Sequence, residues 1–324
     1  MVWTELHRKL HITLKQRGFL PQGERILIAV SGGQDSVCLL RLLLDLRTKW
    51  HWTLAIAHCD HAWPTDEGIA EHVKNLAQAW QLPYFAKVAV NLKETEAAAR
   101  EWRYQALIAI AHEQHFSLIV TGHTQSDRAE TLLYNLIRGA GSNGLQALGW
   151  QRPLTSEIQL LRPLLEITRE ETGHCCQQLQ LPLWEDVLNE KLDYARNRIR
   201  QQLIPYLQSQ FNPQVEKNLA QTVDILQAEV DYLEQVSNQL WPDIASQEGQ
   251  SLNRSKLREI PLALQRRIIR RFLQQRLQKS PTFEQIEALI FLITAPNRSC
   301  SSSLPHNSLV QVQGENLIFI QAGN

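Results

Sequence analysis

The stretch RILIAVSGGQDSVCLL, Arg25 to Leu40, changes its pattern twice. It begins as an apolar run, is interrupted by SGGQDS at residues 31–36, and resumes with leucines at helical spacing. Glycines directly after a strand let the backbone adopt conformations that other residues avoid, so successive N–H groups can converge on an anion. The positive end of the following helix adds to this attraction. The stretch therefore predicts a strand, a loop that binds phosphate or pyrophosphate, and a helix.

The polar residues of this loop suit a phosphate ligand. Ser31 and Ser36 can donate hydroxyl groups to phosphate oxygens, while Asp35 is an acid among groups that attract anions. An acid there makes most sense beside a metal ion or a polar substrate group. A tight turn in which Asp35 and Ser36 cap the next helix is the alternative. Two other nucleotide loops are excluded, because the chain has no GxxxxGK and no GxGxxG after a strand.

Short apolar runs alternate with amphipathic stretches through the first two-thirds of the chain. The predicted strands are 25–30, 53–58, 84–90, 117–121 and 158–161. The predicted helices are 35–46, 66–80, 94–115, 125–138 and 168–179. Such alternation is typical of βαβ units and predicts an α/β fold with a parallel, doubly wound sheet. Ligands of these sheets bind at the carboxyl ends of the strands, where SGGQDS and the later TGH fall.

The pattern changes after Phe211 to almost continuous amphipathic helix. We therefore predict two domains, residues 1–211 and 212–324. The tail SLVQVQGENLIFIQ has period-two alternation around Gly314, which predicts a short hairpin. Within this second domain, the stretch QRRIIRRFL predicts a helix with a basic face opposite an apolar face. The basic face consists of Arg266, Arg267, Arg270 and Arg271, and the apolar face of Ile268, Ile269, Phe272 and Leu273.

Composition restricts the classes of function. The formal net charge is zero, so any contact with nucleic acid has to come from a local concentration of Lys and Arg. No run approaches the roughly 20 apolar residues of a membrane helix. The five cysteines form no CxxC pair, and an odd number does not suit a disulfide framework. We expect a cytoplasmic protein with reduced cysteines and no membrane partner.

Further charged residues follow the later strands. HCDH, residues 58–61, ends the second predicted strand, and Arg100 and Arg103 follow at helical spacing. The strongest second signal is TGHTQSDRAE, whose three titratable residues are His123, Asp127 and Glu130. Their separations of four and three residues would place them on one face if one helix includes them all. Such a set can hold Mg²⁺, hold a cationic amine or accept its proton; a surface cap is the alternative.

The loop SGGQDS resembles the pyrophosphate-binding loop of the N-type ATP pyrophosphatases. The ordered motifs SGGxDS, HxDH, ARxxRY, TGHxxxDxxET, RGxG, RPLL, ED…N and RNRIR resemble the tRNA(Ile)-lysidine synthetases, from about Arg25 to Leu207. The helical tail resembles the first C-terminal domain of that family, in its short form. Two departures stand out. Trp63 and Pro64 occupy the region where the family usually has an arginine, and Val187 and Leu188 replace its usual Pro-Ser.

This resemblance implies an adenine nucleotide alpha hydrolase fold and a two-step reaction. ATP would adenylate the C2 oxygen of the wobble cytidine in the isoleucine tRNA with a CAU anticodon. Free L-lysine would then displace AMP and give lysidine. The residues expected to act in catalysis are Asp35, Arg103, His123, Asp127 and Glu130. The residues expected to bind ATP are Ser31, Gly32, Gly33, Gln34, Asp35, Ser36 and His58, with Mg²⁺ at Asp35.

The remaining expected contacts are with the other two substrates. Those expected to bind lysine or cytidine are Asp60, Arg100, His123, Asp127, Glu130 and Arg196. Those expected to bind tRNA are Arg196, Arg198, Arg200, Arg266, Arg267, Arg270 and Arg271. A solvated surface is the alternative for the last four. Whether the chain forms a homodimer stays open.

Two other functions are the alternatives. A tRNA 2-thiolation enzyme uses the same adenylation, but it ordinarily needs catalytic cysteines or an iron–sulfur site, and Cys175 and Cys176 are adjacent instead of spaced for either. An RNA-binding protein with a vestigial nucleotide site is the second alternative. The intact SGGQDS and HxxxDxxE argue against such decay.

Overall fold

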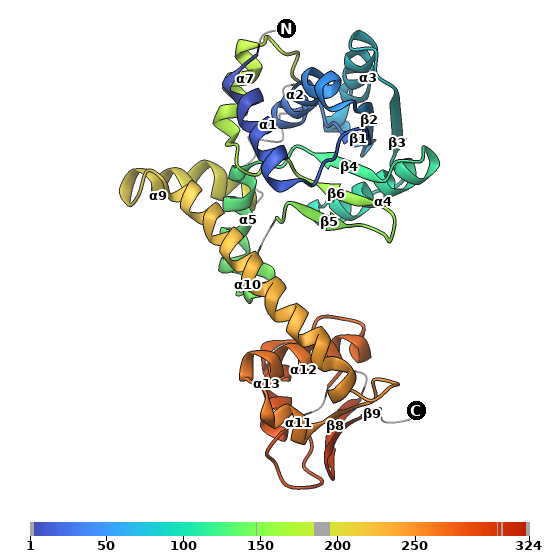
Figure 1. The fold of residues 1–324 in the computed structure, drawn as a ribbon, viewed down its shortest axis with the longest axis vertical. Coiled ribbons are helices and arrows are strands. Elements are labelled where there is room, and N and C mark those ends of the chain that lie inside the picture. The colour runs from blue at the N-terminus through green and yellow to red at the C-terminus, as the bar shows by residue number, and fades with distance from the viewer. Residues whose placement is uncertain (1–2, 147, 185–194, 303, 306, 322–324) are drawn as a thin grey trace. The chain divides into compact units, whose positions relative to one another are not determined.

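The computed structural model describes residues 3–146, 148–184, 195–302, 304–305 and 307–321. Two compact units make up the chain, residues 1–226 and 227–324 (Figure 1). This division falls inside the helix α10 (Val215–Ile244), whereas the sequence pattern placed a boundary at 211/212. The amphipathic pattern of α10 continues through the point where its packing partners change. The sequence therefore does not show a domain boundary within this helix.

The first unit is built on a six-stranded sheet with the order β3-β2-β1-β4-β6-β5. Its parallel strands are β1 (Arg25–Ala29), β2 (Thr53–Asp60), β3 (Tyr84–Val88), β4 (Leu118–Thr121) and β6 (Gln159–Leu161). The predicted parallel α/β fold is confirmed. The antiparallel edge strand β5 (Gln151–Pro153) was not predicted, because its three residues are exposed and show no apolar alternation.

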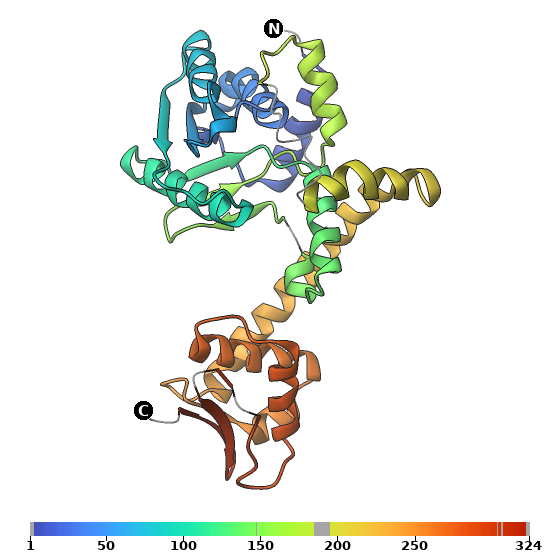
Figure 2. The ribbon, with the colours of Figure 1, turned by 180° about the vertical axis from the view of Figure 1, so that it is seen from behind.

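Side chains of alternate strand residues enter two separate cores. Ile26 and Ile28 of β1 pack in a cluster that includes residues of α1 (Glu5–Arg17), α2 (Gln34–Trp50), α3 (Ile69–Ala79) and α7 (Arg169–Gln178). Leu27 packs in the other cluster, with residues of α4 (Glu96–Glu113). Figure 2 shows α4 on the face of the sheet turned away from α1 and α2. The doubly wound arrangement follows from this alternation, because each face must be covered.

The helix α1 was not predicted, although its sequence explains it. Thr4 accepts from the His7 backbone N–H and forms a capping box, and Gly18 ends the helix at a positive φ of 63°. Leu6, Leu10 and Leu14 lie four residues apart and are buried. Apart from the exposed Ile12, the positions between these leucines are polar, so the apolar stripe of the helix is narrow and easily overlooked.

The order of strands changes direction at β1, whose neighbours are β2 on one side and β4 on the other. This is the point at which doubly wound sheets bind ligands, at the carboxyl ends of the two diverging strands. The loop after β1 carries Ser31 to Ser36, and the loop after β4 carries Gly122. A Cβ on Gly122 would lie 2.9 Å from the carbonyl carbon and oxygen of Asp35, so the two loops touch through backbone.

A helical layer follows β4. It consists of α5 (Gln125–Ile137), α6 (Ser142–Leu145), α8 (Ala195–Arg198), a π-helical turn (Ile199–Leu203), α9 (Ile204–Gln210) and the start of α10. Ala129 and Leu133 of α5 pack on Ile199 and Ile204, with Leu219 of α10 against them. The π-helical turn therefore presents Arg200 beside the start of α5. None of the helices in the described residues is long and apolar enough to cross a membrane.

The second unit combines helices with a small antiparallel sheet. After the end of α10 come β7 (Ser251–Asn253), α11 (Arg254–Glu259), α12 (Leu262–Leu277), α13 (Phe283–Leu292), β8 (Ser308–Gln313) and β9 (Asn316–Gln321). The predicted hairpin is confirmed as β8 and β9, joined through Gly314 at a φ of 57°. The strand β7, which the sequence did not predict, adds to β9 as a third strand.

The apolar face of α12 forms the centre of this unit. Ile268, Ile269, Phe272 and Leu273 have no exposed surface, which confirms the predicted face. They pack against residues of α13, β8 and β9. The ring of Phe272 contacts that of Phe319 edge to face, with centroids 6.3 Å apart.

We predict that Phe272→Ala lowers the free energy of unfolding of the second unit by about 3–5 kcal/mol, because it leaves a cavity in a fully buried position. Urea unfolding followed by tryptophan fluorescence measures this loss. Phe291→Ala is the control, since Phe291 is 73% exposed on α13. Equal losses in the two variants would contradict the assignment of Phe272 to the core.

Candidate active site

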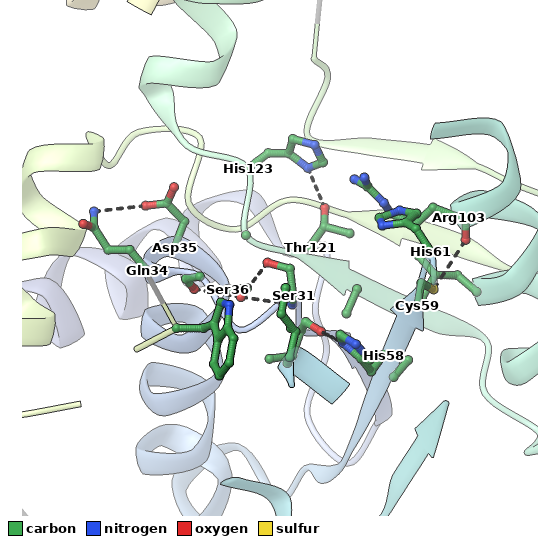
Figure 3. A pocket seen from close by; sticks show the side chains of 18 of the residues that line it. Ser31, Gln34, Asp35, Ser36, His58, Cys59, His61, Arg103, Thr121 and His123 are labelled. Carbon is green, nitrogen blue, oxygen red and sulfur yellow. Dashed lines mark hydrogen bonds between the residues drawn. The ribbon is translucent and has the colours of Figure 1, made fainter. Parts of the chain in front are cut away.

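A cleft of about 440 Å³ lies at the carboxyl ends of β1, β2 and β4 (Figure 3). Its walls come from the loop after β1, the end of β2, α4 and the loop after β4. The predicted site residues that line it are Ser31, Gly33, Gln34, Asp35, Ser36, His58, Asp60, Arg103, His123, Asp127 and Arg200. Five segments that are distant in sequence therefore meet where the change in strand order predicts a ligand.

The loop after β1 is held by its own hydroxyl groups. Ser36 Oγ donates to the carbonyl oxygen of Gly33 at 2.9 Å, and the N–H of Ser31 donates to Ser36 Oγ at 3.2 Å. Gly32 adopts a φ of 88°, and its carbonyl accepts the N–H of Trp184 at 3.0 Å. Gly32 is not among the residues that line the cleft, and its contact with ATP stays a prediction.

Asp35 is held by the first turn of α7. Arg169 Nη1 donates to its Oδ2 at 3.0 Å, and the Thr172 hydroxyl donates to its Oδ1. Gln34 reaches the same turn, because its Nε2 donates to the Arg169 carbonyl at 2.6 Å. Burial raises the pKa of Asp35, as does the charge of Asp127, although Arg169 and Thr172 act in the opposite direction. The start of α2 is thus fixed to α7 as well as to β1.

The carboxylates that line the cleft could hold magnesium only together with ligands from a bound substrate. Asp35 and Asp127 both line it, whereas the described residues contain no group of three or more metal-ligating side chains. Mg²⁺ in nucleotide enzymes is commonly bound by one or two carboxylates together with substrate phosphates. The residues present therefore suit a magnesium ion that arrives with a nucleotide and takes Asp35 as its protein ligand.

His123 lies in the loop between β4 and α5, since α5 begins at Gln125 with Thr124 as its N-cap. The expected single helix containing His123 is therefore wrong. Figure 3 shows its ring above Thr121, and Nδ1 is 2.8 Å from the Thr121 hydroxyl. Burial lowers the pKa of His123 to about 3; the charge of Asp127 acts in the opposite direction, and nearby arginines lower the pKa further. The imidazole is neutral near pH 7.

Asp127 combines a capping role with a place in the cleft. Its Oδ2 accepts the backbone N–H of Thr124 at 2.8 Å and the Thr124 hydroxyl at 2.9 Å, which completes a capping box. The Oδ1 atom lies 3.5 Å from Arg200 Nη2. Asp127 therefore caps α5, as one interpretation predicted, and also lines the cleft, as the ligand-binding interpretation requires.

Glu130 is 2% exposed and does not line this cleft. Its two oxygens accept Arg200 Nε at 2.6 Å and Nη2 at 2.8 Å. It lines instead a second cleft of about 930 Å³, which shares Arg169 and Arg200 with the first. The expectation that Asp127 and Glu130 face one cleft together is therefore corrected. Arg200, expected at the tRNA, lines both clefts and pairs with these acids.

Other predicted residues lie outside the first cleft. Arg100 is half-buried on α4, and Arg196 pairs with Glu96 at 3.0 Å. Arg198 is exposed on α8. The second departure from the resembling family, Val187 and Leu188, lies outside the described residues.

The basic face of α12 is largely engaged within its own unit. The partners are Glu287 for Arg266, Glu234 for Arg267 and Asn238 for Arg271. Arg267 is only 8% exposed, and the Arg271 guanidinium lies 4.1 Å from the centre of the Trp241 ring. The predicted stripe of four exposed arginines is therefore wrong for Arg267. The acids come from α10 and α13, which a count of charges along α12 does not include.

Sequence reasoning missed several residues of the cleft. Arg169 and Thr172 lie more than a hundred positions after Asp35, and no local pattern connects them. His61 pairs with Asp66 at 3.1 Å, and the Trp63 ring stacks on His61 with centroids 4.9 Å apart. A second signal was available for this group, since Trp63 stands in the region where an arginine is usual in the resembling family. His58 was predicted, and its Nδ1 lies 2.8 Å from the Val30 carbonyl oxygen.

Comparison with known proteins gives two domain matches. A PP-loop domain profile matches residues 3–207, and a TilS substrate binding domain profile matches residues 252–316. The tRNA(Ile)-lysidine synthase of Synechocystis sp. is 60% identical over 329 aligned residues, covering 100% of both chains. The chain belongs to the tRNA(Ile)-lysidine synthase family. The Nostoc sp. member is 54% identical, covering 100% of this chain and 98% of its own.

The family extends to a chloroplastic tRNA(Ile)-lysidine synthase of Zygnema circumcarinatum, 37% identical over 86% of this chain and 77% of that one. Among solved structures, the U34-tRNA thiolase NcsA from Methanococcus maripaludis, described with its [4Fe-4S] cluster, has a TM-score of 0.59. It is 18% identical over 69% of this chain and 78% of its own, so the likeness shows a common fold. It lends no support to thiolation as the function of this family member.

The neutral state of His123 has a consequence for stability. The unfolded chain binds a proton at His123 below about pH 6.5, whereas the folded chain does so only near pH 3. Between these values the free energy of unfolding falls as the pH falls. We predict that His123→Gln removes part of this fall between pH 6.5 and 5, by at most about 1.4 kcal/mol per pH unit.

Denaturant unfolding at several pH values measures this effect. His112→Gln, at an exposed position of α4, serves as the control and should follow the unmodified protein. If His123→Gln and the unmodified protein lose stability in parallel, His123 is not held neutral by the fold.

Proposed function

We propose that this chain joins lysine to C2 of the wobble cytidine in the isoleucine tRNA with a CAU anticodon, using ATP and releasing AMP and pyrophosphate. The observation that carries the proposal is the full-length identity of 60% to a tRNA(Ile)-lysidine synthase, together with an intact SGGQDS loop at the cleft. The reaction would take place in the cytoplasm. A homodimer is compatible with this proposal and is not required by it.

ATP would bind with its phosphates at the loop after β1. Backbone N–H groups of this loop and the first turn of α2 supply a positive potential for phosphate oxygens. The hydroxyl groups of Ser31 and Ser36 lie on the same wall. Mg²⁺ held by Asp35 would neutralise charge on the phosphates. Because Arg169 already occupies one oxygen of Asp35, this carboxylate also fixes the distance between α2 and α7.

Lysine would place its amine near Asp127 and His123. A carboxylate attracts the ammonium group before the reaction, and the amine must lose a proton before it attacks C2. His123 is neutral near pH 7, but a pKa held at about 3 by burial makes it a weak base, so in this proposal it binds the lysine amine as a neutral hydrogen-bond partner. Asp60 and Arg103 also line the cleft, where they would contact the cytidine. Glu130 would act through Arg200, which donates to both of its oxygens. Arg100 and Arg196 do not line the first cleft, so their expected contacts with lysine or cytidine would require a movement of the protein.

The decisive experiment incubates the protein with ATP, labelled lysine and an isoleucine tRNA transcript with a CAU anticodon. Mass spectrometry of the digested tRNA should show lysidine, and AMP should form in equal amount. A transcript whose wobble cytidine is replaced by uridine is the control. Label in both transcripts, or in neither, would contradict the proposal.

We predict that Asp127→Asn lowers lysine incorporation more than it lowers lysine-independent activation of the tRNA. Asparagine keeps a side-chain oxygen that can accept the Thr124 N–H in the capping box, but it removes the charge that would hold the ammonium group. Pyrophosphate exchange without lysine measures the first step, and labelled lysine measures the second. Glu157→Gln, an exposed change in the same unit, should affect neither. Equal losses in both steps would place Asp127 at the nucleotide instead.

The second unit would bind the tRNA backbone through the arginines of α12 that remain accessible. We predict that the double change Arg270→Gln and Arg271→Gln weakens tRNA binding and reduces the slope of log affinity against log salt by about 0.7 to 0.9 for each arginine–phosphate pair removed. Arg267 is left unchanged, because its removal would leave Glu234 without this partner. Arg298→Gln, an exposed change outside α12, is the control. An unchanged slope would make α12 a structural helix only.

A further inference from the structure

A group of arginines surrounds Tyr104 at one side of the first cleft. The guanidinium groups of Arg100 and Arg152 lie 5.8 Å and 5.4 Å from the centre of its ring. Arg162 is 2% exposed, and its charge acts on the Tyr104 hydroxyl. Arg103, next to Tyr104, lines the cleft. We call Arg100, Arg103, Arg152 and Arg162 the arginine cluster.

Three separate elements bring the cluster together. Arg100, Arg103 and Tyr104 lie on α4, Arg152 lies on β5, and Arg162 directly follows β6. In the antiparallel pair of β5 and β6, Arg152 is opposite Leu160. The edge strand β5, which the sequence did not predict, therefore places Arg152 beside the Tyr104 ring of α4. Tyr104 lines the cleft.

Acids among the described residues do not balance the charge of this cluster. Within the described part of the chain, none of its four members forms an ion pair, whereas Arg128, Arg169, Arg196 and Arg200 of the same unit each do. Arg162 Nη1 donates to the Gly149 carbonyl at 2.7 Å, but its buried Nε has no partner there. Unpaired like charges in a poorly solvated site cost free energy, which an anion would recover.

Two ionisation equilibria respond to this excess of positive charge. Burial lowers the pKa of Arg162, and Arg100 and Arg152 lower it further. Burial alone would raise the pKa of Tyr104, yet Arg162, Arg100 and Arg152 hold it below its ordinary value. The neighbouring arginines thus lower the pKa of both Arg162 and Tyr104. Such an excess of positive charge is typical of a site that binds a negative ligand.

The position of the cluster distinguishes it from the ATP phosphate site. Figure 3 shows Arg103 beside His61, on the opposite side of the cleft from Gln34 and Asp35. The phosphates of ATP already have the loop after β1 and the start of α2. Guanidinium groups match phosphate oxygens in a bidentate manner, and an aromatic ring beside them suits a nucleotide of an RNA chain.

We propose that the arginine cluster and Tyr104 bind a backbone phosphodiester of the tRNA next to the nucleotide that enters the cleft. This inference rests on the proposed function, because it assumes a tRNA substrate. It assigns Arg152 and Arg162, for which the sequence pattern predicted no role, to positioning the tRNA strand.

Arg152→Gln tests the proposal, since Arg152 is exposed and its replacement should not disturb the fold. The probes are the CAU-anticodon isoleucine tRNA, its isolated anticodon stem–loop, and ATP alone. We expect weaker binding of both RNAs, and a slope of log affinity against log salt that is smaller by about 0.7 to 0.9. The Kd for ATP should stay unchanged. Arg25→Gln is the matched control, an exposed arginine that lies over the Phe116 ring at the other end of β1.

Arg162→Lys and Arg162→Met form a second pair of variants. The lysine keeps the charge, so RNA binding should be restored in part relative to methionine, while unfolding curves report any loss of stability separately. A changed Kd for ATP with an unchanged RNA salt slope would assign the cluster to the nucleotide and overturn the proposal. No change in either would overturn it too. In both cases the lysidine assay still reports on the proposed function independently.

Discussion

The close approach of two backbones at the centre of the sheet is the constraint on which this active site depends. Gly122, at the end of β4, lies so near the first turn of α2 that a Cβ would be 2.9 Å from the Asp35 carbonyl. A residue with a side chain would separate the two loops that form the cleft. Because of this contact, Asp35 and Asp127 line one space although they follow different strands. The hydrogen bond from Arg169 to Asp35 fixes α7 as a third side of the cleft.

The sequence revealed those parts of the structure whose physical cause is local. Strand and helix periods predicted the parallel sheet, because each apolar residue reports its own burial. Glycines between strand and helix predicted the turn after β1 for the same reason, and Gly32 there has a φ of 88°. The apolar face of α12 could be predicted because Phe272 and its neighbours repeat at helical spacing. Where a position is decided by one element alone, single-sequence reasoning is sufficient.

The errors concern residues whose role is decided by a partner distant in sequence. Glu130 has the spacing of a ligand, but Arg200 from the π-helical turn takes both of its oxygens. Arg267 has the spacing of a surface cation, but Glu234 of α10 draws it into a buried pair. His123 failed for another reason, since Thr124 caps α5 and thereby excludes His123 from the helix. Helical periodicity shows on which face of its own helix a residue lies. It does not show which residue of another element packs against that face.

A net charge of zero conceals a strong separation of charge in the first unit. Asp35 of α2 pairs with Arg169 of α7, and the two acids of α5 pair with Arg200, around the place where a nucleotide and its metal would bind. On the other wall of the cleft the arginine cluster stays unneutralised by described residues. His123 lies between these regions and is kept neutral by burial and by the same arginines. A neutral imidazole there adds no further positive charge beside an amine that has to lose a proton before it attacks.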